Sequence, residues 1–458
     1  MRLVKSTTLR NLLMAIGLQL SAFSFLSAQD NSPYSRYGLG DLTPSTNIVN
    51  RGMGGFSAAY ADPLSVNFNN PASYSGFLAY IEQKSKRAAS GRVLFDVGLN
   101  FESHTLREGN SAEKFTSGNA LFSYMQLGMP LRRNWGLSFG LRPVSRISYK
   151  INHFERLSDP ITGQPIDSTV TEFSGDGGAF LATMGTGFAI KNLSIGFNFG
   201  YLFGKKQYAT KRAFVNDTVE YHSSNHSTES SFGNVYANGG IQYKIDLSKK
   251  LLLRLGAYGN LKQNLNAEQD VLRQTFTRTQ SGDIQLDSVF EQKNVKGKVV
   301  YPSGYGFGFL LEKKVDIQNN KYGNWLAGVD FVQNNWSEYR FYGASDSVQN
   351  SWELRLGGQI RPEPKKNYFS NVAYRAGLVI GQDYIHVQNK LPVWGLTFGM
   401  GLPLANYNQL ARTQASIINL SLEYTKRGNN TNLLKDNFFR VSVGISLSDL
   451  WFIKRKYE

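Results

Sequence analysis

The sequence predicts an all-β protein: a transmembrane antiparallel β-barrel of about fourteen strands, with an N-terminal hatch segment inside the lumen. Three observations lead to this prediction. From about Val93 to Phe452, short runs of alternating apolar and polar residues repeat between turns. A basic and then apolar segment precedes them, as in exported proteins. The connections between the runs alternate between short and long, which is typical of outer-membrane barrels.

The last run shows the alternation most clearly. Strand side chains point to alternate faces, so residues two apart share a face. One face of this run is apolar and holds Phe439, Val441, Val443, Ile445 and Leu447. The other face is mostly Gly, Ser and Arg, which fits a polar lumen with lipid outside.

Composition agrees with a single membrane barrel. The 458 residues contain 45 glycines and 13% aromatic residues, and no compositional break divides the chain after residue 90. The chain has no cysteine, which excludes a disulfide framework, a thiolate metal site and a lipidated cysteine anchor. The net charge of +16 fits contact with outer-membrane lipid and lipopolysaccharide phosphates. With an export segment present, we expect no nucleic-acid partner.

Residues 1–29 are predicted to be a cleaved signal peptide. A basic start is followed by an apolar stretch from Leu12 to Phe25, and cleavage is expected after Ala28 or Gln29. The stretch is too short and too polar for a transmembrane helix, and no other segment offers 18 continuous apolar residues.

Residues 30–78 are predicted to be the hatch, and residues 79–458 the barrel. The first segment is rich in Gly, Pro, Asn, Ser and Asp and has no sustained alternation. A barrel of fourteen strands is wide enough to need filling. The strands are expected to start near Val93, Leu121, Trp135, Val170, Leu193, Ser231, Leu251, Val299, Trp325, Ser351, Asn371, Val393, Ala415 and Phe438.

The connections predict the orientation in the membrane. The short links are 130–134, 191–192 and 246–250, and the segments interpreted as long outer loops are 103–119, 152–168, 205–230 and 264–298. Because periplasmic turns are short, both chain ends are expected on the periplasmic side.

The predicted register places charges of both signs on the inward face. We expect most of them to pair with one another as a structural network, since charges are tolerated in a lumen and costly against lipid. They are Asp96, Glu102, Arg142, Arg254, Asp330, Glu353, Arg355, Arg375, Glu423 and Arg440.

A motif in the hatch carries a family resemblance. Residues 52–74 read GMGGFSAAYADPLSVNFNNPASY, and the spacing from Gly54 to Asn70-Pro71-Ala72 resembles the N-terminal segment of the FadL family of outer-membrane transporters. The runs 32–41 and 174–178 and the ending 451–456 are similar to FadL-like proteins of Bacteroidota. The resemblance implies a fourteen-stranded barrel closed by a hatch, in agreement with the strand count.

The resemblance also implies a path for small hydrophobic compounds past Asn70, Pro71 and Ala72. A simple turn before the first strand is the alternative for these three residues, since Asn-Pro is a common turn signal. Pro143 lies inside the third predicted strand, where it cannot donate a ladder hydrogen bond. In the FadL family a kink in the third strand opens a lateral exit, so Pro143 marks either such an exit or a structural bulge.

Signals for catalysis and metal binding are weak. His222 and His226 have a spacing that binds metal on a helix, but they lie in a polar segment without a helical pattern. Nothing in the sequence nominates a nucleophile. We therefore expect no enzyme activity, no cofactor and no metal site.

Two hypotheses about function follow. The first is a FadL-type outer-membrane transporter or channel for small hydrophobic compounds, with a lateral exit near strand three. It predicts an apolar pocket between the outer loops and the hatch. The second is a FadL-like barrel that does not transport and serves as a subunit or shuttle of a secretion or barrel-assembly machine, with protein partners. A general porin ranks third, because the N-terminal segment argues against an open pore.

Overall fold

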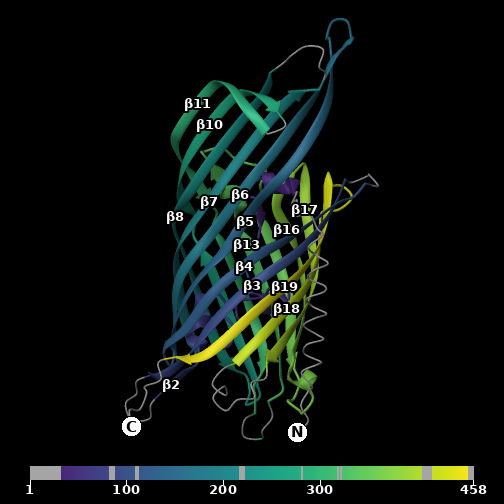
Figure 1. Cartoon of the computed structure of the whole chain (residues 1–458). Helices are drawn as coiled ribbons and strands as arrows, with labels where there is room; N and C mark the ends of the chain where they lie inside the picture. The colour runs from purple at the N-terminus through teal and green to yellow at the C-terminus, as the bar shows by residue number, and fades with distance from the viewer. Residues whose placement is uncertain are drawn as a thin grey trace.

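The computed structural model confirms the predicted fold class. It describes residues 32–451 except 82–87, 109–112, 216–221, 280–281, 317–318, 320–321 and 405–414. These residues form a closed antiparallel barrel of fourteen spanning strands (Figure 1). Sequence neighbours pair around the barrel, and β19 pairs with β3 to close it. The predicted signal peptide lies outside the described residues.

The spanning strands are numbered in chain order. They are β3 (Ala88–Glu108), β4 (Phe115–Arg132), β5 (Trp135–Ser158), β6 (Pro165–Ile190), β7 (Leu193–Phe214), β8 (Ser223–Asp246), β9 (Leu251–Asn260) with β10 (Gln263–Thr279), β11 (Gly282–Tyr301) with β12 (Gly304–Lys313), β13 (Asn324–Asn334), β15 (Ser351–Arg361), β16 (Ala373–Val387), β17 (Asn389–Leu404), β18 (Ala415–Arg427) and β19 (Leu434–Trp451).

Short elements precede the barrel or lie in its connections. They are η2 (Pro33–Arg36), β1 (Asp41–Leu42), α2 (Ile48–Arg51), η3 (Pro71–Gly76), β2 (Ala79–Ile81), η4 (Trp336–Glu338), β14 (Arg340–Phe341) and η5 (Tyr368–Asn371). No helix in the described part of the chain is long and apolar enough to cross a membrane.

The alternation has the direction that the sequence predicts. On β7, Phe197, Phe199 and Tyr201 are exposed on the outer face of the barrel. Ser194 and Asn198, on the other face of the same strand, are buried. Polar residues therefore line the lumen and apolar residues cover the outside, as in a membrane barrel.

Two neighbouring spanning strands are each broken at the same level. The chain leaves the ladder after Asn260 and again at Pro302, and Asn260 lies opposite Gly304 while Gln263 lies opposite Tyr301. Pro302 has no N–H to give to the ladder. The Asn260 side chain donates to the Pro302 carbonyl at 2.9 Å, so an amide side chain replaces part of the lost pairing.

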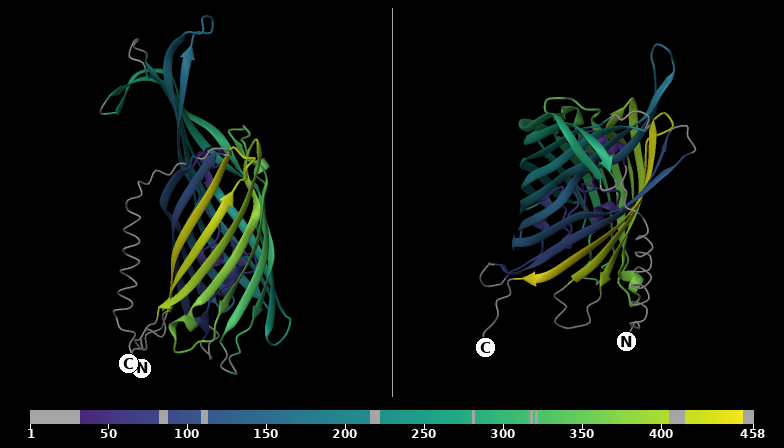
Figure 2. Two further views of the ribbon diagram at one scale, coloured as in Figure 1. Left: turned by 90° about the vertical axis from the view of Figure 1, so that its right-hand side faces the viewer. Right: turned by 45° about the horizontal axis from the view of Figure 1, so that its top comes forward.

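The strands differ in length around the barrel. Six of them, β5 to β8 with β10 and β11, continue far beyond one end as a curved sheet that projects from the barrel (Figure 2). We call this the long-strand end, and the opposite end the short-turn end. The segments 103–119, 152–168, 205–230 and 264–298 were expected to be loops, and this interpretation is wrong: most of their described residues are strand.

The hatch fills the lumen, as the sequence predicts. Residues 32–78 run from the long-strand end downward inside the barrel, drawn in purple in Figure 2. At the long-strand end, Tyr34 and Leu39 pack with Trp336, Tyr339 and Tyr384 in an aromatic cluster. Further down, Met53, Phe56 and Tyr60 form a second cluster with Leu310 and Leu326 of the wall.

Candidate functional site

The Asn-Pro-Ala motif starts a capped turn that is fixed to the wall. Asn70 is the N-cap of η3, and its side-chain oxygen accepts from the Ala72 N–H at 3.1 Å. Its amide nitrogen donates to the Ala58 carbonyl at 2.6 Å and to the Ile241 carbonyl of β8 at 3.2 Å. Pro71 occupies the first helical position, where its missing N–H costs nothing. All three motif residues are buried, and none of them lines a described cavity.

A ring of inward glycines lets the hatch backbone touch the wall. A Cβ added at Gly196 would collide with the Pro71 backbone, and one at Gly240 would collide with the Asn70 side chain. Comparable contacts with hatch residues occur at one glycine on each of most spanning strands: Gly98, Gly128, Gly136, Gly187, Gly196, Gly240, Gly256, Gly328, Gly357, Gly377, Gly399 and Gly444. These contacts show that the hatch is packed closely against most of the circumference of the barrel.

Arg51 of α2 anchors the hatch to the seam where the barrel closes. Its guanidinium donates to Glu423 at 2.7 Å, to Asn100 at 2.9 Å, and to the hydroxyls of Ser123 at 3.2 Å and Ser442 at 2.7 Å. Burial lowers the pKa of Arg51, and the charge of Glu423 opposes that effect. One hatch side chain therefore joins β3, β4, β18 and β19.

The predicted inward charges extend this network. Glu423 also accepts from Arg440 at 3.0 Å, and Arg440 pairs with Glu102. Glu102 and Asp436 both contact His104, which lies nearer the long-strand end. On the opposite wall, Asp330 accepts from the backbone N–H groups of Ser57 at 2.5 Å and Ala58 at 2.7 Å. Five of the ten predicted inward charges thus pair with one another, namely Glu102, Glu353, Arg355, Glu423 and Arg440, whereas Asp330 binds the hatch backbone.

Arg142 differs from the other predicted inward cations. Arg254, Arg355 and Arg440 have carboxylate partners, and Arg375 donates to Gln359 and Asn419. Among the described residues Arg142 has no carboxylate partner and no side-chain amide partner. Its guanidinium lies 5.4 Å from the centre of the Phe68 ring of the hatch. It borders two lumen cavities, at the level where β4 and β5 separate.

Pro143 lies where β5 loses its pairing with β4. The β4–β5 ladder runs from Arg132↔Trp135 to Met125↔Leu141 and goes no further. On its other side β5 pairs with β6, with a bulge between Pro143 and Ser145. Figure 1 shows β3 and β4 diverging from β5 and β6 toward the long-strand end.

The start of the hatch covers the released edge of β5. Thr43 donates from its backbone to the Val144 carbonyl at 3.0 Å and from its hydroxyl to the Pro143 carbonyl at 2.8 Å. Further along, β1 pairs with Ser145 and Arg146, and the Ser32 N–H donates to the Ser148 carbonyl at 3.0 Å. Beyond Leu141, β4 and β5 are thus no longer paired, and hatch residues line the inner side of the seam between them.

The bulge also changes the character of the outward face of β5. Before it, the outward residues are Trp135, Leu137, Phe139 and Leu141. After it the alternation is shifted by one residue, and the less buried positions are polar, beginning with Arg146, Ser148, Lys150 and Asn152. The lipid-facing part of β5 therefore ends at the bulge.

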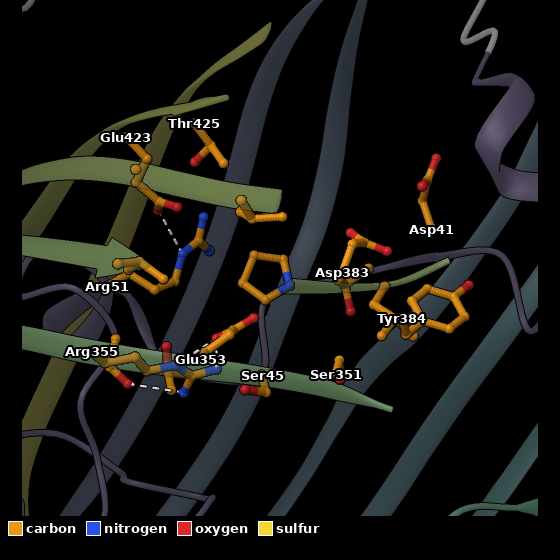
Figure 3. Close-up of a pocket in the computed structure, with 18 of the residues that line it drawn as sticks. Asp41, Ser45, Arg51, Ser351, Glu353, Arg355, Asp383, Tyr384, Glu423 and Thr425 are labelled. Carbon is orange, nitrogen blue, oxygen red and sulfur yellow. Dashed lines mark hydrogen bonds and ion pairs between the residues drawn. The ribbon is translucent and has the colours of Figure 1, made fainter. Parts of the chain in front are cut away.

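A cavity beside the hatch contains several charged side chains. This cavity of about 300 Å³ lies between residues 41–46 and the wall, and Figure 3 shows the charged side chains that point into it. Glu353 pairs with Arg355 at 2.7 Å, and Asp383 pairs with Arg427 at 2.8 Å. A second cavity of about 100 Å³ adjoins the broken strands and contains Tyr236, Asn238 and Asn260. Both spaces are lined by a mixture of polar and apolar side chains.

An apolar pocket of about 180 Å³ lies at the long-strand end. Hatch residues around η2 form one side, and Ile151 of β5 with the ends of β16, β17 and β19 forms the other. The Tyr34 hydroxyl donates to the Leu434 carbonyl at 2.6 Å, and burial raises the pKa of Tyr34 to about 12, so it stays a donor at neutral pH. The lining consists of Pro33, Tyr34, Arg36, Tyr37, Ile151, Ile385, Val387, Asn389, Leu391, Asn432, Leu433 and Leu434.

These pocket residues were not singled out in the sequence. Their only signal is the run 32–41, which contains Tyr34 and Tyr37 but shows no periodicity. Within the described part of the chain, no group of three His, Cys, Asp or Glu residues is arranged to hold a metal ion. His226 lies within β8 and is not part of such a group.

Solved structures share the fold at low sequence identity. A FadL homologue of Pseudomonas aeruginosa aligns with a TM-score of 0.51 and 12% identity, over 90% of this chain and 100% of its own. The toluene transporter TodX of Pseudomonas putida gives 0.51 and 14%, over 90% and 99%. The CymD monoaromatic hydrocarbon channel gives 0.50 and 12%, over 90% and 98%.

No curated protein sequence matches the chain. A family model does: the model of the BamG family covers residues 8–458. That range contains the whole barrel and the hatch, and the barrel has the FadL-like fold that the hatch motif predicts. The chain belongs to the BamG family, a family of FadL-like outer-membrane β-barrels.

Proposed function

We propose that this barrel sits in the outer membrane and moves small hydrophobic compounds from the outside into the bilayer by a lateral route. The observation that carries the proposal is the position of the apolar pocket. Its residue Ile151 belongs to β5, beyond the point where β4 leaves that strand, so the pocket and the open seam border the same strand. A hydrophobic compound in the pocket has a short path along β5 to the lipid.

The fixed hatch supports a lateral rather than a straight route. Asn70, Pro71 and Ala72 hold η3 against the wall, and inward glycines bring the hatch backbone into close contact with most of the strands. In this proposal a compound that enters at the long-strand end leaves beside the first part of the hatch, near Pro143 and Thr43. The names of CymD and TodX describe channels for hydrocarbons and toluene, and this substrate class fits the apolar pocket.

The test is uptake of radiolabelled toluene by cells that carry the protein or a variant. Pro143→Val gives β5 an N–H at the bulge and favours pairing, so uptake is expected to fall toward that of cells without the protein. Pro403→Val is the control, because Pro403 lies in β17 and pairs with Ile417 far from the seam. Unchanged uptake in Pro143→Val, with the barrel folded, would rule out an exit at this proline.

A second function is favoured by the charged lumen. The central cavity contains ion pairs such as Glu353–Arg355, which solvate an apolar compound poorly. The sheet at the long-strand end also offers a large protein surface. In this alternative the chain is a non-transporting subunit or shuttle of an outer-membrane secretion or barrel-assembly machine.

Purification of the native protein in a gentle detergent separates the two functions. A monomer that retains hydrophobic small molecules or lipid supports transport. Protein partners in fixed stoichiometry, without such ligands, support the role as a subunit.

A further inference from the structure

The two lumen cavities beside the hatch differ in the charges of their linings. The larger one, of about 300 Å³, is lined by carboxylates as well as by arginines. The smaller one, of about 100 Å³, is lined by Arg142 and Arg355, and no carboxylate is among the described residues that line it. We call this space the smaller lumen cavity. The charges in its lining are therefore all positive.

Arg355 is compensated by a carboxylate outside the lining of the smaller lumen cavity. Its guanidinium pairs with Glu353 at 2.7 Å and donates to the Gly55 carbonyl at 3.2 Å. Arg142 is half-buried and has no carboxylate partner in the described part of the chain. A charge that is removed from water is costly unless it is paired. Arg142 is therefore the group in this cavity that a bound anion would stabilise.

The guanidinium of Arg142 is held in a defined place. Arg142 lies on β5 between Leu141, where the β4–β5 ladder ends, and the bulge at Pro143. The guanidinium lies 5.4 Å from the centre of the Phe68 ring of the hatch, which lines the same cavity. A guanidinium that rests on an aromatic ring keeps the N–H groups at its edge for other partners. Arg142 thus offers a positioned set of donors to the cavity.

Two tyrosine hydroxyls border the same space. Tyr236 of β8 and Tyr301 at the end of β11 both line the cavity, and their rings pack edge to face with centroids 6.0 Å apart. Tyr301 also packs against Trp336, at 6.1 Å between centroids. Among the described residues neither hydroxyl has a hydrogen-bond partner, and the charge of Arg142 is close enough to act on both. One guanidinium and two hydroxyls are therefore available as donors around one cavity.

We propose that the smaller lumen cavity binds a phosphate group, held by Arg142, Tyr236 and Tyr301. A guanidinium pairs with two oxygens of an oxyanion, and a phosphate has further oxygens for the two hydroxyls, whereas a carboxylate has none left. A water molecule takes about 30 Å³ in the liquid, so the cavity has room for a group of a few heavy atoms. The proposal does not depend on transport, because the apolar pocket is a different space.

The phosphate can come from two sources. A free phosphate would arrive through the lumen, since Arg142 and Tyr301 also line the larger cavity. A lipid head group would arrive through the wall. Asn260 and Gly304, which line the smaller lumen cavity, lie where the two neighbouring strands are broken, and Leu261 in this break is 83% exposed. The chains of such a lipid would stay outside the barrel. The chemistry of the bound group is the same in both cases.

The first measurement is isothermal titration calorimetry of the full chain in a maltoside detergent with inorganic phosphate. We expect one bound phosphate per chain. A hydrogen bond to a charged group contributes about 1.5–3 kcal/mol, so Arg142→Gln is expected to weaken binding by at least about tenfold. Arg375→Gln is the control, because Arg375 lies in the lumen, lines neither cavity and donates to Gln359 and Asn419. Its affinity for phosphate should equal that of the unaltered chain.

The second measurement is native mass spectrometry of the chain released from nanodiscs that contain phosphatidylglycerol. A lipid adduct that is present in the unaltered chain and in Arg375→Gln, and is lost in Arg142→Gln, would identify a lipid head group as the source. Binding of inorganic phosphate without such an adduct would identify free phosphate. Either result supports the phosphate site.

Three results would overturn the proposal: no binding of phosphate or lipid, equal binding by Arg142→Gln, or displacement of phosphate by an equal concentration of chloride or acetate. Heat-modifiable gel migration verifies that each variant is folded. Should Arg142→Gln fail to fold, Tyr236→Phe and Tyr301→Phe test the site, because each removes one donor and keeps the packed ring. Unchanged affinity in both tyrosine variants would likewise contradict the assignment.

Discussion

At the scale of single residues, Arg51 shows how firmly the hatch is held. It is buried and donates to four side chains of the wall, including the Glu423 carboxylate. Arg51→Leu leaves Glu423 with less compensation in a buried site, so we expect the free energy of unfolding to fall by about 3 kcal/mol. Urea denaturation in detergent micelles measures this change. Arg51→Lys keeps one charge and should lose less; equal stability of all three proteins would contradict the anchor.

Gly240 and Gly239 form a matched pair on opposite faces of β8. A Cβ at Gly240 would collide with Asn70, whereas one at Gly239 would lie 3.5 Å from Phe197, an ordinary contact. We therefore expect Gly240→Val to displace η3 from the wall and Gly239→Val to leave it in place. Limited trypsin digestion, read at Arg51 and Lys244, should show faster cleavage only in Gly240→Val. Identical digestion patterns would mean that the hatch accommodates the added valine side chain without displacement of η3.

An irregularity in the third strand could be predicted from the sequence because one residue type disrupts pairing wherever it occurs in a strand. Pro143 was located because a proline inside a strand cannot donate to a ladder, and the structure places it at a bulge where β4–β5 pairing has ended. Tyr34 and Tyr37 were missed as pocket residues, because their contacts are with Leu391 and Leu434, more than 350 residues away. No local pattern encodes such contacts.

At the scale of elements, the hatch crosses the lumen and contacts opposite walls of the barrel. It spans the lumen from the aromatic cluster at Tyr34 to η3 near the short-turn end. Its polar contacts reach opposite walls, because Arg51 pairs with Glu423 and the Ser57 N–H donates to Asp330. Deleting residues 30–78 should therefore open the lumen. We expect a higher single-channel conductance in planar bilayers for the deletion variant than for the intact protein. A porin-like conductance of the intact protein would show that the hatch does not seal the barrel.

The strands were predicted well within the membrane and poorly beyond it. On β7 one face meets lipid and the other the lumen, so the period of two is visible from Leu193 to Phe203. On β11 almost every residue from Gly282 to Gln292 is exposed, so neither face needs to be apolar and the period disappears. The same loss of pattern explains why the outer halves of β5 and β6 were taken for a loop.

At the scale of the whole molecule, closure of the barrel follows from the count of membrane-spanning runs. Each run alternates because it separates lipid from a polar lumen, and an unclosed sheet would leave bare edges in the bilayer. Closure requires the first and last spanning strands to pair, and β19 and β3 do so from Leu434↔Glu108 to Trp451↔Gly91. The register of this pairing could not be predicted from the sequence. Register depends on the hatch as well, since Arg51 joins both strands.

The orientation in the membrane is testable because the chain has no cysteine of its own. Short turns are expected on the periplasmic side, so Ile161, 92% exposed at the tip of β5 and β6, should face the outside. Ile161→Cys should react with a membrane-impermeant maleimide on intact cells. Lys249→Cys, in the turn between β8 and β9, should react only after the outer membrane is permeabilised. The opposite labelling pattern would mean that the barrel has the inverse orientation in the membrane. The apolar pocket and the edge of β5 would then face the periplasm.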